Sequence, residues 1–351
     1  MKKYFFFLIA LLSLAACDDG IQEHWPDPYH PYGYATLYIA TPGFPGYPEM
    51  IYSIGGDTIY QCEEGAHIQS LLAEDKDWYA LLKNDNGVYS SIKNGKLLRE
   101  YSGTVHDFAV DGGSVYTLQE HENHMIWVCK DGQLLYDVPD YVQYNMFSVN
   151  DGNIAIPICD EQPGYWYNSN LVKIDGLEHG FKQVYGIDVN GDDILITYES
   201  KQQAGKYFYW WNGNNYELPE TFIPTTSQLV NGHPVVIGRK TSSQDIHGTH
   251  CIPIAIVDGI ESVLSHEEDL AAVQLFAYGS FTFILVKDVG GSDSNMCAVF
   301  QNLRPMYMEK NITVPEELRK FYIHNFSDDG STISLDELGI TAIARVSIVP
   351  W

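Results

Sequence analysis

Short apolar runs alternate with tight polar turns along most of the chain, and this alternation predicts its elements. Residues 187–218 show the pattern in full: a strand, a turn at 189–192, a strand, a polar loop, a strand, a turn at Asn212-Gly213, and a strand. Asn-Gly and Asp-Gly pairs tolerate the positive φ angles of a two-residue turn, so between apolar flanks they predict β-hairpins. Two successive hairpins give a unit of four antiparallel strands.

This four-stranded unit recurs about every 40 residues, the length of a propeller blade. Two turns can be followed in each unit, one after its first strand and one after its third. The later turn is predicted at Gly55-Gly56, Asn94-Gly95, Asp131-Gly132, Asp175-Gly176, Asn212-Gly213, Asp258-Gly259 and Asn302-Leu303. The earlier turn is predicted at Asp75-Lys76, Asp111-Gly112, Asp151-Gly152, Asn190-Gly191, Asn231-Gly232, Tyr278-Gly279 and Asp329-Gly330.

The repeat predicts an all-β fold, a β-propeller of seven four-stranded blades. The first unit has only its later turn and the last unit only its earlier turn, so the N- and C-terminal strands are expected to share a closing blade. Six or eight blades are alternative counts, and an antiparallel sandwich is the alternative architecture. Sandwiches do not usually keep two turns in step over seven units, which favours the propeller.

The N-terminus has the pattern of a targeting segment. Lys2-Lys3 precede an apolar run at 4–12, and Leu14-Ala15-Ala16-Cys17 then resembles the lipobox of bacterial lipoproteins. This resemblance implies a signal peptide at 1–16 and a lipidated Cys17 that anchors the protein in a bilayer. An ordinary cleaved signal peptide is the alternative. Residues 17–34 are rich in proline and aromatic residues and predict an extended tether, followed by a single domain at 35–351.

Net charge excludes one class of partner. The formal charge is −26, and loss of Lys2 and Lys3 with the signal peptide would bring it to −28. So acidic a surface argues against binding nucleic acid or anionic lipid head groups. The five cysteines after Cys17 form no CxxC pair and are predicted to be buried small hydrophobic residues.

Aromatic residues provide the candidate ligand site. In a four-stranded propeller, the loops between second and third strands share one face with the connections between blades, opposite the tight turns. We predict that 160–168 is the longest such loop. Tyrosine and tryptophan rings beside Asp, Asn and Gln suit sugars; the alternative is that the rings cap the sheet edges. The candidate residues are Tyr141 and Tyr144 in the preceding connection, and Tyr165, Trp166 and Tyr167 in the loop.

Two His-x-x-His spacings provide a candidate metal site, formed by His121 and His124 and by His247 and His250. Histidine near carboxylates suits transition metals such as zinc. Both spacings fall in predicted loops, whereas paired zinc-binding histidines of the HExxH type need a helix, so a solvated polar loop is the main interpretation. Residues 188–193 imitate the start of a calcium loop but lack its downstream glutamate. No cofactor is expected, with zinc or calcium as the alternative.

The repeated strand-Asn/Asp-Gly-strand pattern resembles that of lipid-anchored β-propeller lipoproteins of the Gram-negative envelope. It is seen in Tyr209-Trp210-Trp211-Asn212-Gly213 and again in Ile256-Val257-Asp258-Gly259. This resemblance implies an outer-membrane lipoprotein, surface-exposed or periplasmic, that binds and presents a glycan or protein ligand without catalysis. One alternative is an envelope assembly scaffold, like the propeller lipoprotein of the outer-membrane assembly machine. A glycosidase or lyase is the other, although the sequence has no GxSxG elbow and no phosphate-binding glycine loop.

Overall fold

The computed structural model describes sixteen parts of the chain, and every regular element in them is a strand. No helix in these parts is long and apolar enough to cross a bilayer. The described residues are 35–41, 48–53, 58–74, 77–121, 125–138, 146–159, 163–174, 177, 180–244, 249–264, 266, 268–278, 281–288, 297–301, 304–305 and 345–350.

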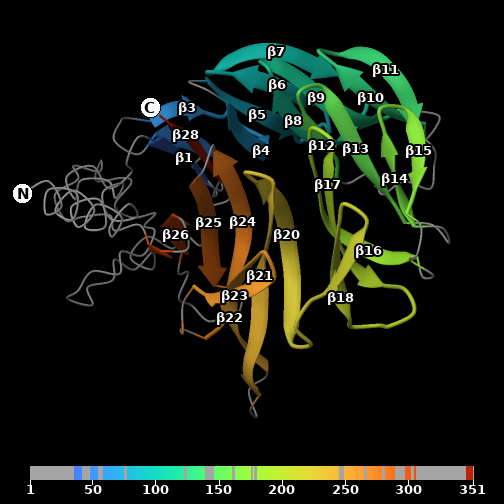
Figure 1. The fold of residues 1–351 in the computed structure, drawn as a ribbon. Coiled ribbons are helices and arrows are strands. Elements are labelled where there is room, and N and C mark those ends of the chain that lie inside the picture. Colours follow the sequence, from blue (N-terminus) through green and yellow to red (C-terminus); the bar gives the residue numbers. More distant parts are fainter. Residues whose placement is uncertain are drawn as a thin grey trace, which may run out of the picture.

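The described strands form seven four-stranded antiparallel sheets, which follow one another around a ring (Figure 1). One edge strand of each sheet lies on the inside of the ring. Each of these inner strands contacts the inner strand of the next sheet, and the series returns to its start. The predicted β-propeller and its count of seven blades are therefore confirmed. In ring order the inner strands are β28, β4, β8, β12, β16, β20 and β24.

Blade 1 closes the ring by joining the two ends of the described chain. Its inner strand is the last in sequence, and it pairs with the first strand so that Ala35 lies opposite Pro350. The predicted shared closing blade is confirmed. From the inside outwards, blade 1 contains β28 (Arg345–Pro350), β1 (Ala35–Thr41), β2 (Met50–Ser53) and β3 (Thr58–Gln61).

Each of the other blades uses four strands that are consecutive in sequence, with the inner strand first. Blade 2 contains β4 (Ala66–Glu74), β5 (Asp77–Asn84), β6 (Tyr89–Lys93) and β7 (Lys96–Tyr101). Blade 3 contains β8 (Thr104–Asp111), β9 (Ser114–Glu120), β10 (Ile126–Lys130) and β11 (Gln133–Val138). Blade 4 contains β12 (Ser148–Asn150), β13 (Asn153–Ile158), β14 (Gly164–Tyr167) and β15 (Asn170–Lys173).

The last three blades have the same order. Blade 5 contains β16 (Phe181–Asn190), β17 (Asp193–Ser200), β18 (Tyr207–Trp211) and β19 (Asn214–Glu217). Blade 6 contains β20 (Phe222–Val230), β21 (His233–Gln244), β22 (Thr249–Val257) and β23 (Ile260–Val263). Blade 7 contains β24 (Leu270–Tyr278), β25 (Phe281–Asp288), β26 (Cys297–Gln301) and β27 (Arg304–Pro305).

The turns between third and outer strands show why Asn and Asp recur there. Asn94 and Asn212 have φ angles of 48° and 45°, which these residues tolerate better than most. Their side-chain oxygens also accept hydrogen bonds from the second strand of the blade, from the Trp78 and Ile194 amides at 3.0 Å. One residue type thus supplies both the left-handed backbone and a clamp on the neighbouring strand.

The later turn predicted for blade 4 was wrong. In blade 4 the turn is formed by Asn168 and Ser169, with φ angles of 45° and 68°, and the Ile154 amide donates to Asn168 Oδ1 at 2.8 Å. The pair chosen from the sequence, Asp175-Gly176, comes after the end of β15 and lies outside the described residues. The prediction chose a pair that contains glycine, whereas the turn that forms in blade 4 contains no glycine.

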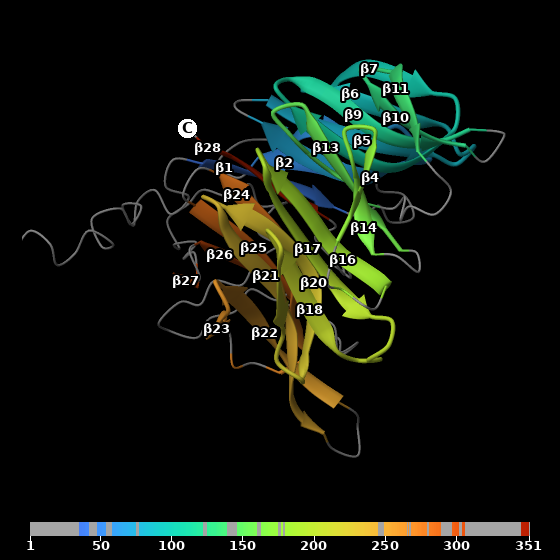
Figure 2. The same cartoon turned by 45° about the vertical axis from the view of Figure 1, so that its right-hand side comes forward.

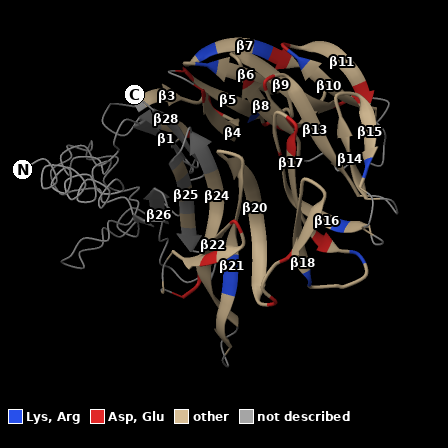
Figure 3. Cartoon of the chain, viewed as in Figure 1, with Lys and Arg blue, Asp and Glu red and all other residues tan. Residues whose placement is uncertain are grey.

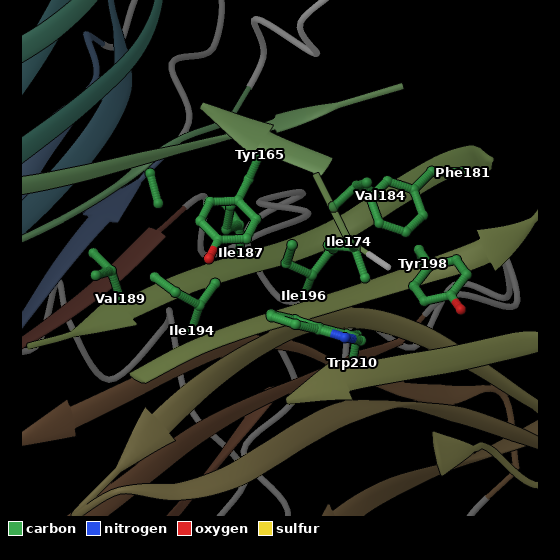
Figure 4. Close-up of a cluster of buried hydrophobic side chains, with 11 residues drawn as sticks. Tyr165, Ile174, Phe181, Val184, Ile187, Val189, Ile194, Ile196, Tyr198 and Trp210 are labelled. Atoms are coloured by element: carbon green, nitrogen blue, oxygen red, sulfur yellow. The ribbon is translucent and has the colours of Figure 1, made fainter. Parts of the chain in front are cut away.

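The apolar core lies between blades. In the cluster drawn in Figure 4, Ile194 and Ile196 of blade 5 pack with Tyr165 of blade 4. The inner strands β16 of blade 5 and β20 of blade 6 contact each other and lie side by side in Figure 2. Cys62, Cys129, Cys159 and Cys251 are free thiols, of which all but Cys159 are buried, as predicted for small hydrophobic residues.

The ring has two different faces. One face, the turn face, carries the hairpin turns described above and those between inner and second strands. The other, the loop face, carries the connections between blades and the loops between second and third strands. Because Ala35 pairs with Pro350 where the inner strand ends, the chain enters and leaves the ring at the turn face.

Candidate functional site

The predicted aromatic loop is a strand. Tyr165, Trp166 and Tyr167 lie in β14, the third strand of blade 4. Tyr165 is 9% exposed in the core between blades 4 and 5, with its ring centroid 6.0 Å from that of Trp210. Trp166 packs between blades 3 and 4, and the Tyr167 hydroxyl donates to the Gly191 carbonyl at 3.2 Å.

This placement corrects the sequence prediction, because these rings fill the gaps between blades and form no exposed loop. The misplaced turn in blade 4 caused the error, since it moved the expected third strand further along the chain. A ligand role for the three residues stays a prediction. Tyr141 and Tyr144 lie outside the described residues.

The histidine candidates are only partly within the described chain. The His121 ring packs against Trp127 with the centroids 3.6 Å apart and the ring planes tilted by 32°. His250 Nδ1 lies 3.1 Å from Asp269 Oδ1. His124 and His247 lie outside the described residues. Within the described ranges, no group of three or more His, Cys, Asp and Glu side chains is placed to hold a metal ion. The metal site stays a prediction.

On the turn-face side of the ring, carboxylates tie blade 2 to blade 3 and blade 3 to blade 4. Glu74 accepts hydrogen bonds from the Gly112 and Gly113 amides, both at 2.7 Å. Asp111 accepts from Asp151 and Gly152 at 2.9 and 2.7 Å. Each acceptor lies at the end of an inner strand and each donor in a turn of the following blade, so these acidic residues are structural.

A third carboxylate of this kind, Asp188 in β16, joins three blades. Its Oδ1 accepts from the Ser148 hydroxyl of blade 4 at 2.8 Å, and its Oδ2 from the Leu229 amide of blade 6 at 2.7 Å. Burial raises the pKa of Asp188 to about 6, against the lowering effect of these hydrogen bonds. Residues 188–193, whose sequence is similar to the start of a calcium loop, therefore contribute Asp188 to the contacts between blades.

Toward the loop face, the inner strands share an irregularity. In five blades the inner strand has a β-bulge at the same position, five residues before the strand ends. Bulges re-aim side chains and are frequent beside functional sites. The bulge residues differ in chemistry while their position is fixed: Gln69, His106, Tyr185, Thr225 and Val273.

A second varied position accompanies each bulge. It is the seventh residue of the second strand, and in four of these blades it is Lys83, Glu120, Glu199 or Arg239. In blade 3 the two positions are in contact, because His106 Nε2 lies 2.8 Å from Glu120 Oε2. In blade 5, burial raises the pKa of Tyr185 to about 12, with smaller contributions from the nearby Tyr207 and Glu199. We call these bulge and second-strand residues together the mouth residues.

In blade 5, the mouth residues Tyr185 and Glu199 lie beside a lysine and a second tyrosine. Glu199 is 6% exposed and its Oε1 accepts from Lys182 Nζ at 2.7 Å and from the Gly205 amide at 2.9 Å. Burial alone would raise the pKa of Glu199, but these two hydrogen bonds outweigh it and lower the pKa. Beside this carboxylate, the Tyr185 and Tyr207 rings meet edge to face with their centroids 5.7 Å apart.

Charge around this site differs from that of the molecule as a whole. Figure 3 shows basic segments beside β16 and β18, where the sequence has Lys182, Lys201 and Lys206. In a chain with a formal charge of −26, this gathering of lysines makes the loop end of blade 5 locally less acidic.

Sequence reasoning missed the mouth residues. The signal appears only when the blades are aligned on the observed ends of their inner strands, because the turn pairs predicted from the sequence place the bulges in two neighbouring columns. Aligned on the strand ends, all bulge positions fall into one column. That column holds amide, imidazole, phenol, hydroxyl and aliphatic groups. The bulges themselves shift the alternation of inward and outward residues by one, which hides the column from a search for regular strands.

Comparisons with known proteins identify no family for the chain. No protein-family model and no curated protein matches the chain. Similar solved structures include the computationally designed Ika8 protein, at 13% identity and a TM-score of 0.44 over 72% of this chain and 80% of that one. BamB from Moraxella catarrhalis is 13% identical, with a TM-score of 0.42 over 76% and 80%.

The β-propeller domain of the Trilobed protease from Pyrococcus furiosus is 13% identical, with a TM-score of 0.37 over 71% of this chain and 74% of that one. Likeness at this level is a likeness of fold and does not carry function. The class that the structure defines is a seven-bladed β-propeller, and this rests on its own seven sheets.

Proposed function

We propose that the chain is a membrane-anchored extracytoplasmic binding protein that holds a glycan or protein ligand on its loop face, at the mouth residues, without catalysis. The observation that carries this proposal is the contrast between the two ends of the inner strands. Near the turn face, carboxylates repeat one structural task. At the bulges, one backbone position presents five different side chains, as expected of a surface shaped by a ligand.

The path of the chain supports this arrangement. The tether at 17–34 leads into β1, which begins at the turn face opposite Pro350. An acylated Cys17 in the outer membrane would therefore hold the ring by its turn face. The mouth residues, at the other face, would remain open to a ligand.

The test is binding by the chain from residue 17 onward, with Cys17 replaced by serine, to a glycan array and to membrane proteins by crosslinking. Gln69→Trp and Thr225→Trp add bulk at two bulges, and we expect each to weaken binding at least tenfold. Asp192→Trp, at an exposed turn-face position, is the matched control and should bind normally. Equal binding by all three variants would reject the mouth residues as the site.

Repeating the array with EDTA tests the metal prediction separately. Loss of binding on chelation would support a zinc or calcium site, with His121 and His250 as the described ligand candidates. Retention would remove the metal from the binding model.

A second candidate function, an envelope assembly scaffold, is favoured by one observation. The outer strands β7 and β11 expose adjacent leucines: Leu97 and Leu98 are 61% and 46% exposed, and Leu134 and Leu135 are 49% and 46%. Apolar side chains gathered on a surface often mark protein contacts. Under this alternative, Leu97→Asp with Leu134→Asp abolishes crosslinks to membrane partners, while the tryptophan variants at the mouth keep them.

A further inference from the structure

The site in blade 5 combines two aromatic rings and a carboxylate on one face of the sheet. Tyr207 lies directly opposite Glu199 in the pairing of β18 with β17, and Gln183 lies opposite Glu199 on β16. Directly paired residues point to the same side of a sheet. The bulge at Tyr185 adds its ring to this side, where it meets Tyr207. Both tyrosines are partly exposed.

The carboxylate has an unused oxygen. Both hydrogen bonds to Glu199, from Lys182 and Gly205, go to Oε1. Oε2 accepts no hydrogen bond from the described residues, although the side chain is only 8% exposed. Oε2 is not one of the buried polar atoms left without a partner in the described chain, so it keeps contact with solvent and is open to a donor that a ligand brings.

Charge balance selects the class of ligand. Lys182 already pairs with Glu199 at 2.7 Å, so a cationic ligand would have to displace it. An anionic ligand would lie against Oε2. A neutral ligand with hydroxyl donors meets neither obstacle, and its apolar face can pack on the tyrosine rings.

We infer that blade 5 binds a neutral sugar residue of a glycan, one of whose hydroxyls donates to Glu199 Oε2 while its C–H face packs on Tyr207. Lys182, 52% exposed at its side chain, has donors left for a second sugar oxygen. This inference rests on the proposed binding function and deepens it, because it assigns one site and one chemical class to the ligand.

The experiment measures binding of three soluble probes to the Cys17→Ser chain: neutral hexose oligosaccharides, chitosan oligosaccharides and oligogalacturonates. We expect binding of neutral probes only. Glu199→Gln replaces the free acceptor by an amide that can present N–H, so it should weaken neutral binding about tenfold or more, the worth of a hydrogen bond to a charged group. Tyr207→Ala should weaken it similarly by removing the ring.

Lys182→Gln provides a test of the charge argument. It leaves Glu199 without its cation, so affinity should move toward the positively charged chitosan probe. Tyr216→Ala is the matched control, because Tyr216 is an exposed tyrosine on the outer strand of the same blade. Circular dichroism and the urea midpoint show that each variant is folded, and Tyr207→Phe keeps the packing should Tyr207→Ala unfold.

The outcomes separate the two proposals. Neutral binding that survives both Glu199→Gln and Tyr207→Ala overturns the blade 5 assignment and leaves a glycan-binding propeller with its site elsewhere. Binding restricted to charged probes overturns the neutral class. No binding to any glycan overturns this inference and leaves only the protein-ligand form of the proposed function.

Discussion

Single acidic residues in this protein hold neighbouring blades together, and Asp188 makes the stability of the ring depend on pH. Its carboxylate accepts hydrogen bonds from two neighbouring blades, and the pKa is raised from 3.8 to about 6 mainly by burial. An acid whose pKa is higher in the folded state binds its proton more tightly there. Its ionisation therefore lowers stability as the pH rises through about 4 to 6.

Asp188→Asn should remove this pH dependence. Asparagine mimics the protonated acid, because its oxygen can accept from the Leu229 amide and its amide can donate to the Ser148 hydroxyl. We expect the free energy of unfolding of the variant to gain on the wild type by about 2 kcal/mol at pH 7.5 relative to pH 4.5, at about 1.4 kcal/mol for each pKa unit. Urea unfolding at both pH values measures this, and parallel pH profiles would contradict it.

Among the elements, the hairpin turns show what could be read from the sequence. Asn-Gly and Asp-Gly pairs identified most later turns, because their tolerance of positive φ is a local property. In blade 4 the same backbone is formed by Asn168-Ser169, where the side-chain clamp on the second strand replaces the glycine signal. That clamp depends on a strand several residues away, so no local pattern revealed it.

Turn strain gives the second prediction, a matched pair of substitutions. Ser169 has a φ of 68°, a left-handed angle that costs a non-glycine residue about 1–2 kcal/mol, partly offset by the greater freedom of glycine in the unfolded chain. Ser169→Gly should thus stabilise by about 0.5–1 kcal/mol. Gly213, at the same turn position in blade 5 with open space around it, should lose a similar amount in Gly213→Ser.

Thermal or urea unfolding of these two variants checks the pair. Because the space at Gly213 is open, a loss there reports backbone strain and not a clash. Opposite signs in the two blades would support one shared turn geometry. A destabilised Ser169→Gly would mean that the serine side chain has a role beyond the turn.

At the scale of the whole molecule, the architecture was more predictable than the site. Two turns in step along the chain required four strands per unit, which the seven four-stranded sheets confirm. The half-units at the ends required a shared blade, which the pairing of β1 with β28 confirms. The mouth residues depend instead on bulges and on which blades are neighbours. Glu199 and Tyr185 become a site only when β16 and β17 pair with the offset that the bulge imposes.

Closure of the ring gives the last prediction. β28 pairs with β1 over six residues and contacts the inner strands of both neighbouring blades, β4 and β24. Deleting 345–351 leaves β1 as an unprotected edge and opens the ring between those blades. At about 1 kcal/mol for each lost backbone hydrogen bond, the free energy of unfolding should fall by on the order of 5 kcal/mol. Urea unfolding would show this as a large fall in the midpoint, together with a greater tendency to aggregate.

Deleting Trp351 alone is the control, because it keeps β28 and should change the urea midpoint little. If the longer deletion left the midpoint unchanged, the closing blade would contribute nothing to stability, and the ring would have to be held by the other six blades through their own inter-blade carboxylates and cores.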